Sequence, residues 1–524
     1  MIPMPQSYIK RILNARIYDL AIETPLELAP LVSSRIGSKV LLKREDLQPV
    51  FSFKIRGAYN KLLQLKPSVR EAGVIAASAG NHAQGLALAA QHLKINATIV
   101  MPRTTPAIKV DAVKFRGAKV ILHGDTYDEA STYAQKLVNE KGLTYIHPYD
   151  DADVIAGQGT VGMEILRQYS GHIDAMFIPV GGGGLCAGVA AYIKYVRPEI
   201  KIYAVEPEEA ACLKAAMDKN RRVTLPEVGI FADGVAVAQI GKEPYRIMKD
   251  LIDGVITVST DEICAAIKDI FEDTRSIAEP AGAVGLAGLK KYAAEHDGSQ
   301  QTLVTTVSGA NTNFDRLRYI SERTEIGEKR EAILAVTIPE KPGAYKKFLQ
   351  TLGKRNITEF NYRYADDKDA CIFVGVQVSP DIPASDKVKG VSDRLELVKD
   401  LENKGYAVVD MTDNEMAKLH IRHLVGGHAP NINDEAVYRF EFPERPGALF
   451  NFLTKLAGRW NISMFHYRNH GSASGRVLVG MQIPKSDRKA VKNFLDELSS
   501  DGAWRYWDET DNEAYQLFLG SRAD

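Results

Sequence analysis

Cysteine is scarce in this sequence, and the few cysteines lie far apart. There are four in 524 residues, Cys186, Cys212, Cys264 and Cys371, and no two have the short spacing of a metal-binding or redox pair. We therefore expect no metal site and no disulfide framework. Four unpaired thiols are typical of a reduced, cytoplasmic protein.

Long apolar runs and net charge are also missing. No stretch approaches the roughly 20 apolar residues that span a bilayer, and residues 1–8 lack the charged head and apolar core of a secretory signal. The 66 basic and 66 acidic residues cancel, so no global charge attracts nucleic acid or an anionic membrane. These absences favour a small-molecule ligand, with no nucleic-acid or membrane partner.

Short β-rich runs alternate with helical periodicity between about residues 70 and 310. Such alternation predicts an α/β fold with parallel sheets and helices on both faces. Ligands of these sheets bind at the carboxyl ends of strands. We expect helices at 126–140 and 261–272, and buried strands at 74–78, 97–101, 119–123, 144–147 and 301–307.

One lysine and four glycines carry the clearest chemistry. Lys54 stands at the expected start of a helix between Phe51, Phe53 and Ile55, and partial burial would lower the pKa of its amine and make it nucleophilic. Further along, an expected strand at 173–180 runs directly into four glycines. Without Cβ atoms their amides can converge on an anion, although a flexible turn is the simpler alternative. A phosphorylated aldehyde cofactor needs both an amine and an anion cradle.

Two more polar segments follow expected strands. In the loop 78–82 the amides and the Ser78 hydroxyl could receive a carboxylate, and Asn81 can donate to a phenolic oxygen. The alternative is an ordinary helix cap, with a structural His82. Ser308 ends the last strand of the region. A serine beside a pyridine nitrogen gives a weaker electron sink than a carboxylate, which suits elimination better than transamination.

After a charged stretch at 321–330 the sequence repeats itself once. Each copy reads strand, turn, helix, two strands, helix, strand, which is the ferredoxin-like βαββαβ order of an α+β domain. The matching segments are 341–349 with 445–453, 356–363 with 461–468, and 373–377 with 478–482. We expect domains at 1–325, 331–423 and 432–524.

These segments together resemble the fold-type-II pyridoxal-phosphate enzymes. The runs 52–58, 78–85 and 181–185 are similar to those of the threonine and serine dehydratase branch, and the doubled C-terminal unit extends the resemblance to the biosynthetic threonine deaminases. The resemblance implies a catalytic domain of two parallel-sheet subdomains followed by two ACT-like domains. It also implies pyridoxal 5'-phosphate as cofactor, L-threonine and L-serine as substrates, isoleucine as inhibitor with valine opposing it, and a homotetramer.

The same resemblance implies residue roles. Lys54 would be the Schiff-base lysine and general base. Further cofactor contacts would come from Asn81, Gly181, Gly182, Gly183, Gly184, Leu185 and Ser308. Substrate contacts would come from Ser78, Ala79, Gly80, Asn81 and His82. Effector contacts would come from Tyr362, Arg363, Tyr467 and Arg468, with half-buried strand aromatics as the alternative for the two tyrosines.

Departures from related families narrow the activity. Serine racemases of this branch carry a second serine where Ala79 stands, so two-base racemisation is disfavoured. A racemase-like metal site is also incomplete, because the matching positions after Glu206 are Ala210 and then Cys212, where an aspartate would be expected. The resemblance to the cysteine synthases is weaker, because an aspartate would normally follow the lysine in that family, where this chain has Ile55. The remaining alternatives are a serine dehydratase or racemase-like enzyme, and an amino-acid sensor on an inactive fold.

Overall fold

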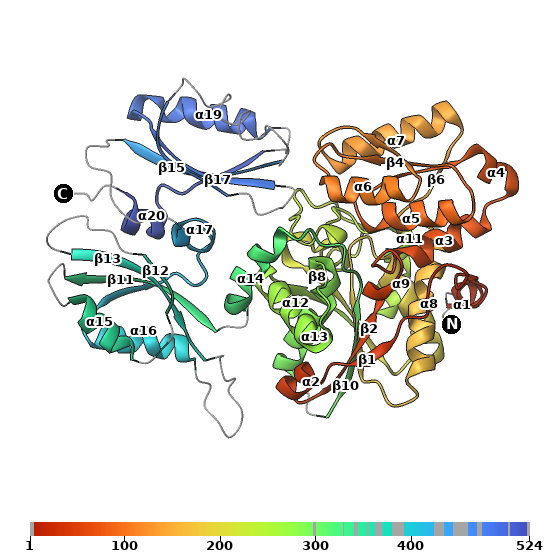
Figure 1. The fold of residues 1–524 in the computed structure, drawn as a ribbon, viewed down its shortest axis with the longest axis horizontal. Coiled ribbons are helices and arrows are strands. Elements are labelled where there is room, and N and C mark those ends of the chain that lie inside the picture. The colour runs from red at the N-terminus through yellow and green to blue at the C-terminus, as the bar shows by residue number, and fades with distance from the viewer. Residues whose placement is uncertain are drawn as a thin grey trace. The chain divides into compact units, whose positions relative to one another are not determined.

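The chain divides into two compact units, Met1–Ser321 and Glu322–Asp524 (Figure 1). The computed structural model describes residues 5–296, 300–327, 330–339, 344–353, 355, 357–361, 369–379, 392–423, 434–443, 460–468, 474–500 and 504–520. Within those ranges no helix is both long and apolar enough to cross a bilayer. The first unit is an α/β fold with two mostly parallel sheets, and the second contains two antiparallel sheets.

The smaller sheet of the first unit is parallel, in the order β5-β4-β3-β6. Val74 and Ala76 of β3 pack with α3, α5 and α6 on one face, whereas Ile75 and Ala77 pack with α7 on the other. Burial on both faces is why β3 is a continuous apolar run. The strands are β3 (Val74–Ala77), β4 (Ala97–Met101), β5 (Lys119–Leu122) and β6 (Thr144–Tyr145), and the helices are α3 (Lys54–Gln64), α4 (Pro67–Ala72), α5 (Asn81–His92), α6 (Ala107–Phe115) and α7 (Tyr127–Lys141).

The larger sheet has the order β1-β2-β10-β7-β8-β9, with only β1 antiparallel. Its strands are β1 (Leu26–Leu28), β2 (Lys39–Arg44), β7 (Ala175–Pro179), β8 (Lys201–Pro207), β9 (Gly254–Val258) and β10 (Thr302–Val307). The helices of this subdomain are α1 (Pro5–Leu13), α2 (Pro30–Ile36), α8 (Ala152–Gln168), α9 (Gly184–Val196), α10 (Cys212–Asp218), α11 (Lys242–Leu251), α12 (Thr260–Thr274) and α13 (Pro280–Glu295). Helix α14 (Arg316–Gly327) begins in the first unit and ends in the second.

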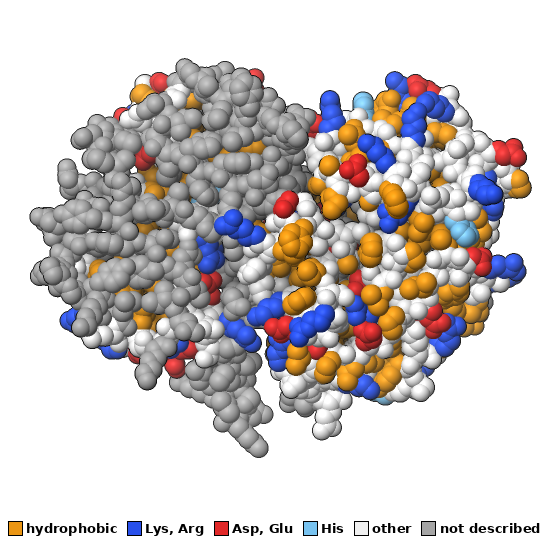
Figure 2. Space-filling model, viewed as in Figure 1, with side chains coloured by type: hydrophobic (Ala, Val, Ile, Leu, Met, Phe, Trp, Pro, Cys, Tyr) orange, Lys and Arg blue, Asp and Glu red, His pale blue; other side chains and the backbone are white. Residues whose placement is uncertain are grey.

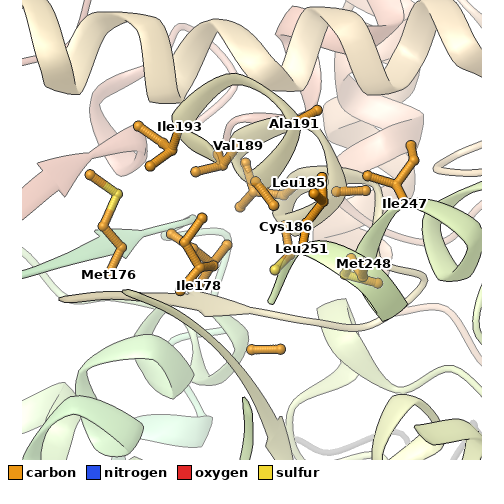
Figure 3. Packing of buried hydrophobic residues seen from close by; sticks show 14 of the residues in the cluster. Met176, Ile178, Leu185, Cys186, Val189, Ala191, Ile193, Ile247, Met248 and Leu251 are labelled. Carbon is orange, nitrogen blue, oxygen red and sulfur yellow. The ribbon is translucent and has the colours of Figure 1, made fainter. Parts of the chain in front are cut away.

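An apolar face of α9 anchors this subdomain. Leu185, Val189 and Ile193 recur every four residues and lie in one buried cluster with Met176 and Ile178 of β7 (Figure 3). A four-residue spacing places side chains on one face of a helix. The packing therefore sets the start of α9 at the carboxyl end of β7.

The expected strand positions are close to those observed, but the expected burial is wrong for two of them. β5 lies at a sheet edge with Leu122 48% exposed, and β6 spans only two half-buried residues. An edge strand is covered less than a central one, so its apolar residues do not imply full burial. The sequence analysis also missed β1, β2, β8 and β9.

Charge is mixed on the surface of the first unit. Figure 2 shows basic and acidic side chains interspersed with apolar ones on the face in view. No single sign of charge dominates that face, in keeping with the zero formal balance of the chain.

The second unit contains two sheets of matching topology, β12-β13-β11-β14 and β16-β17-β15-β18, each antiparallel throughout. This is the strand order of the expected ferredoxin-like repeat. The first repeat contains β11 (Glu331–Pro339), α15 (Ala344–Leu352), β12 (Ile357–Asn361), β13 (Asp369–Gln377), α16 (Asp393–Asn403), β14 (Ala407–Asp410) and α17 (Glu415–Leu419). The second contains β15 (Glu435–Pro443), β16 (Asn461–Arg468), β17 (Ser474–Gln482), α19 (Arg488–Leu498), β18 (Arg505–Asp508) and α20 (Glu513–Phe518).

The two repeats share one apolar core. Phe373 and Met416 of the first repeat lie in the same buried cluster as Leu478 and Phe518 of the second. Both short helices, α17 and α20, contribute to this cluster. The two repeats therefore form a single folding unit.

A matched pair of asparagines lies between the repeats. Asn414 caps α17 and Asn512 caps α20, each through its side-chain oxygen, and the Asn414 amide donates to the Asn512 oxygen at 3.3 Å. A threonine lies two residues before each cap. The Thr412 hydroxyl accepts from a backbone amide of β11, and the Thr510 hydroxyl accepts from a backbone amide of β15. The segments 410–415 and 508–513 are a fourth sequence match between the repeats, which the sequence analysis missed.

Buried ion pairs fix helix α3. The Arg56 guanidinium has no exposed side-chain surface and binds Glu45 at 2.7 Å and Glu164 at 2.8 Å. Glu164 also pairs with the buried Lys43 at 2.7 Å. Two positive and two negative charges thus compensate one another away from water, and they join β2, α3 and α8.

We predict that Arg56→Met lowers the free energy of unfolding of the first unit by about 3–5 kcal/mol, because it leaves buried carboxylates without their partner. Urea denaturation followed by circular dichroism measures this loss. Lys61→Met on the same helix is the matched control: its half-buried ion pair with Asp151 at 2.7 Å should contribute less than about 1 kcal/mol. Equal losses for the two variants would contradict the assignment.

Candidate active site

A cavity lies where the carboxyl ends of both sheets of the first unit meet. Of the residues proposed from sequence, Lys54, Asn81, the four glycines, Leu185 and Ser308 line it, whereas Ser78, Ala79, Gly80 and His82 are not part of its lining. The complete lining is Phe53, Lys54, Asn81, Pro148, Tyr149, Gln158, Pro179, Gly181, Gly182, Gly183, Gly184, Leu185, Gly234, Val235, Glu279, Ala281 and Ser308.

Lys54 is the first residue of α3 and lines this cavity. Its Nζ donates to the Pro148 carbonyl at 3.1 Å and lies 5.3 Å from the centre of the Phe53 ring. Burial lowers the pKa of Lys54, a nearby Glu279 partly offsets this, and the result is about 8. About a tenth of the amine is therefore neutral at pH 7, far more than for an ordinary lysine. Only the neutral amine acts as a nucleophile or a base.

The segment before Lys54 is tied to the end of β10. The Phe53 amide donates to the Ser308 carbonyl at 3.2 Å, and the Ala310 amide donates to the Phe51 carbonyl at 2.8 Å. These two bonds hold the lysine and Ser308 at the same cavity although 254 residues (308 − 54) separate them in the sequence.

The four glycines form a loop with no room for side chains. A Cβ on Gly182 would lie 2.1 Å from the Tyr149 ring, and one on Gly181 would lie 2.7 Å from the Val235 backbone. Gly183 has a φ of +92° and immediately precedes α9, a conformation that favours glycine. Within the described part of the chain, the amides from Gly181 to Leu185 have no hydrogen-bond acceptor. Free amides at the start of a helix form a cradle for a phosphate group.

Asn81 and Ser308 also face the cavity, and each is held by other residues. Asn81 donates to Glu279 and accepts from the Asn311 amide at 2.7 Å. The buried Ser308 hydroxyl donates to the Ala281 carbonyl at 3.2 Å. A hydroxyl cannot act as a strong acid or base, so Ser308 can only offer a neutral hydrogen bond to a ligand.

The loop of Ser78 is used mainly to begin helix α5. The Ser78 hydroxyl accepts from the Gly80 and Ala83 amides at 3.3 Å each. The buried His82 ring bonds the Ile146 carbonyl at 3.0 Å. Burial, followed by the charge of Lys54, lowers the pKa of His82 to about 3, so the ring is neutral. These contacts match the structural alternative for Ser78 and His82, and a substrate role for this loop stays a prediction.

Among the lining residues that the sequence analysis did not propose, Tyr149 and Glu279 contact proposed site residues. Tyr149 packs against Gly182 and also stacks edge-on with His147, with ring centres 4.6 Å apart. Glu279 is only 2% exposed and accepts the Asn81 hydrogen bond. The one available signal was an isolated acid, Glu279, directly before the apolar and glycine-rich stretch that begins at Pro280.

The Glu206 carboxylate is bonded to the backbone at the start of α10. Its two carboxylate oxygens accept from the Leu213 and Lys214 amides at 2.8 Å each. The Cys212 thiol donates to the Gly181 carbonyl at 3.6 Å. In the described ranges no three His, Cys, Asp or Glu side chains gather as metal ligands.

The expected effector residues can be placed only in part. Tyr362 and Arg363 lie outside the described residues. The backbones of Tyr467 and Arg468 form the end of β16 and pair with Val477 and Arg476 of β17.

Comparison with known proteins identifies two family matches. Residues 17–309 match the model of the pyridoxal-phosphate dependent enzymes. Residues 322–421 and 426–519 each match the C-terminal regulatory domain of threonine dehydratase. The donor-rich glycine loop and the lysine of low pKa fit a phosphorylated aldehyde cofactor.

Curated relatives match along nearly the full length. The biosynthetic L-threonine dehydratase of Burkholderia multivorans is 51% identical over 98% of this chain and 99% of its own. That of Escherichia coli is 50% identical over 99% and 98%. The mitochondrial threonine dehydratase of Saccharomyces cerevisiae is 48% identical over 98% and 89%.

The solved structures below match about three-fifths of this chain. The processed threonine deaminase isoform 2 of Solanum lycopersicum has a TM-score of 0.61 at 48% identity, covering 62% of this chain and 90% of that one. Maize serine racemase has a TM-score of 0.56 at 34% identity, covering 59% and 95%.

We predict that Gly182→Ala weakens binding of pyridoxal phosphate by about 10- to 100-fold, because the new methyl group would overlap the Tyr149 ring and displace the amide cradle. Titration of the apo-protein with the cofactor, followed by absorbance, measures the dissociation constant. Gly162→Ala is the control, since a Cβ there meets neighbours at an ordinary 3.4 Å. Unchanged affinity in Gly182→Ala would remove the glycine loop from the binding site.

Proposed function

This chain belongs to the biosynthetic threonine dehydratases, a pyridoxal-phosphate-dependent family, and from that membership we propose that it converts L-threonine to 2-oxobutanoate and ammonia. The reaction is a β-elimination catalysed by a carbon–nitrogen lyase, the step that commits threonine to isoleucine synthesis. The observation that carries the proposal is the placement of a lysine of lowered pKa and a loop of free amides in one cavity.

The chain's own groups divide the work. The amides of the glycine loop would hold the cofactor phosphate, Asn81 would donate to its phenolic oxygen, and Ser308 would bond its ring nitrogen. When bound, pyridoxal phosphate supplies an electron sink for the pair released at the substrate Cα. The neutral amine of Lys54 would take the Cα proton as general base.

Two residues favour elimination over the competing reactions. Ser308 offers only a neutral hydrogen bond, so the electron sink is weaker than one with a carboxylate partner. Ala79 has no hydroxyl or other base, so no second base is available at that position for racemisation. L-serine is the alternative substrate, because it carries the same β-hydroxyl and would give pyruvate.

We further propose that the second unit senses isoleucine and valine. Two copies of the regulatory domain provide two related sites, with Tyr362, Arg363, Tyr467 and Arg468 as the proposed contacts. If isoleucine binds a less active state more tightly, inhibition follows from linkage, and valine opposes it by preferring the active state.

We also propose that the protein is cytoplasmic and forms a homotetramer. Free cysteines support the reducing compartment, since Cys186, Cys212 and Cys264 are buried and unbridged. Light scattering of the purified chain measures the oligomeric state directly.

We predict that Lys54→Ala loses the yellow absorbance of the bound cofactor and lowers threonine turnover by at least about 1,000-fold, because the general base is removed. Production of 2-oxobutanoate from threonine and of pyruvate from serine measures turnover. Borohydride reduction and peptide mapping should label Lys54 in the parent protein. Lys61→Ala on the same helix is the control, and labelling of another lysine would refute the assignment.

We predict that Tyr467→Phe raises the isoleucine concentration needed for half-inhibition by about 5-fold or more, with no change in turnover when isoleucine is absent. The measurement is threonine turnover across an isoleucine series, with valine added in a second series. Tyr506→Phe in the same repeat is the control, because its hydroxyl bonds Asp496 and should not affect inhibition. Equal effects of the two changes would contradict an effector role for Tyr467.

A further inference from the structure

Glu279 is a buried carboxylate in the cavity without an assigned role. It directly precedes helix α13, is 2% exposed, and lines the same cavity as Lys54. Its backbone amide donates to the Gly309 carbonyl at 3.1 Å, so its position is fixed from the main chain. A buried acid next to a reactive amine needs a physical explanation, because burial alone disfavours it.

The Glu279 side chain is joined to Asn81 in a short chain of hydrogen bonds. The Asn311 amide donates to the Asn81 oxygen at 2.7 Å and to the Val50 carbonyl at 2.7 Å. The Asn81 amide in turn donates to Glu279. This arrangement fixes which way the Asn81 amide faces and leaves its second N–H for the cavity.

Burial and the surrounding charges together place the pKa of Glu279 close to neutral pH. Burial raises the pKa of Glu279 and Asp233 raises it further, while Lys109 and Arg316 act in the opposite direction, and the result is about 7. Asp233 itself is ionised: burial would raise its pKa, but Lys109 at 2.6 Å and Arg316 outweigh this and lower the pKa to about 2.

The charges that face Lys54 are fewer. Glu279 is the acid whose charge raises the pKa of Lys54 against the effect of burial. The two imidazoles nearby, His82 and His147, both have pKa values lowered chiefly by burial. Their rings are therefore neutral where Glu279 titrates, so the carboxylate dominates the local charge.

We propose that Glu279 is a positioning residue that sets the proton affinity of the Lys54 amine and orients the Asn81 amide toward the cofactor. An ionised Glu279 makes Lys54 a stronger base, and a protonated Glu279 makes it a weaker one. The strength of the proposed general base then rises with pH as the carboxyl loses its proton. The inference depends on the proposed function only in taking Lys54 as the reactive amine.

The first test follows the Lys54 amine in the full-length apo-protein, without turnover. Competitive labelling with acetic anhydride across pH, read by peptide mapping, gives the midpoint of Lys54 ionisation. In Glu279→Gln that midpoint should move down by about half a pH unit or more, because a buried negative charge is lost. Glu279→Asp keeps the charge and should restore most of the parent midpoint.

Glu206→Gln is the matched control. Glu206 is also buried with a pKa raised to about 7, chiefly by burial, but it caps α10 and is absent from the cavity lining. Its loss should leave the Lys54 midpoint unchanged. An equal shift in both glutamine variants, or no shift in Glu279→Gln, overturns the inference.

A second test uses the pH dependence of the holoenzyme's visible absorbance. Glu279→Gln should shift that titration in the same downward direction, and Glu279→Asp should stay near the parent. If Glu279→Gln does not fold, the parent curve decides: because ionisation of Glu279 near pH 7 raises the proton affinity of the amine, Lys54 labelling should rise with pH less steeply than one ionisation allows. A curve fitted by a single ionisation overturns the inference. Failure to bind cofactor or deaminate threonine would instead count against the proposed function, since the apo-protein labelling does not depend on it.

Discussion

The ion pairs of the buried Arg56 guanidinium are the constraint on which the rest of the site depends. They fix helix α3 against β2 and α8, and the lysine two residues earlier takes its place from that helix. The bonds between 51–53 and 308–310 then bring the end of β10 to the same point. Because charged groups out of water demand well-placed partners, this network specifies one position for α3 more narrowly than apolar packing alone.

Charge compensation is repeated on the other side of the cavity in a weaker form. Asp233 forms ion pairs with Lys109 and Arg316, whereas Glu279 accepts a hydrogen bond from the neutral Asn81 amide. Asp233 is thus kept ionised, whereas the titration midpoint of Glu279 lies near neutral pH. Environments that shift the pKa values of two neighbouring acids in opposite directions are typical of catalytic sites.

The sequence was enough to predict the parts of the site that depend on local pattern. Four glycines after a strand, a lysine among aromatics and a serine at a strand end are all visible in short windows, and the structure places them at one cavity. Glu279 and Tyr149 could not be found in this way, because each acts through a contact with a residue distant in sequence. The burial of β5 was misjudged for a related reason. Whether a strand lies at a sheet edge depends on the order of all strands in the sheet, and the sequence of one strand does not reveal that order.

The shared core of the two regulatory repeats has a consequence for how such a unit can evolve. Each repeat presents an apolar sheet face and one short helix to the other, and the asparagines Asn414 and Asn512 meet between them. Losing one copy would expose side chains such as Phe373 or Phe518 to water and invite aggregation. Duplication and deletion in this lineage should therefore act on the pair as a whole, and a chain with a single repeat would need a second molecule to cover it.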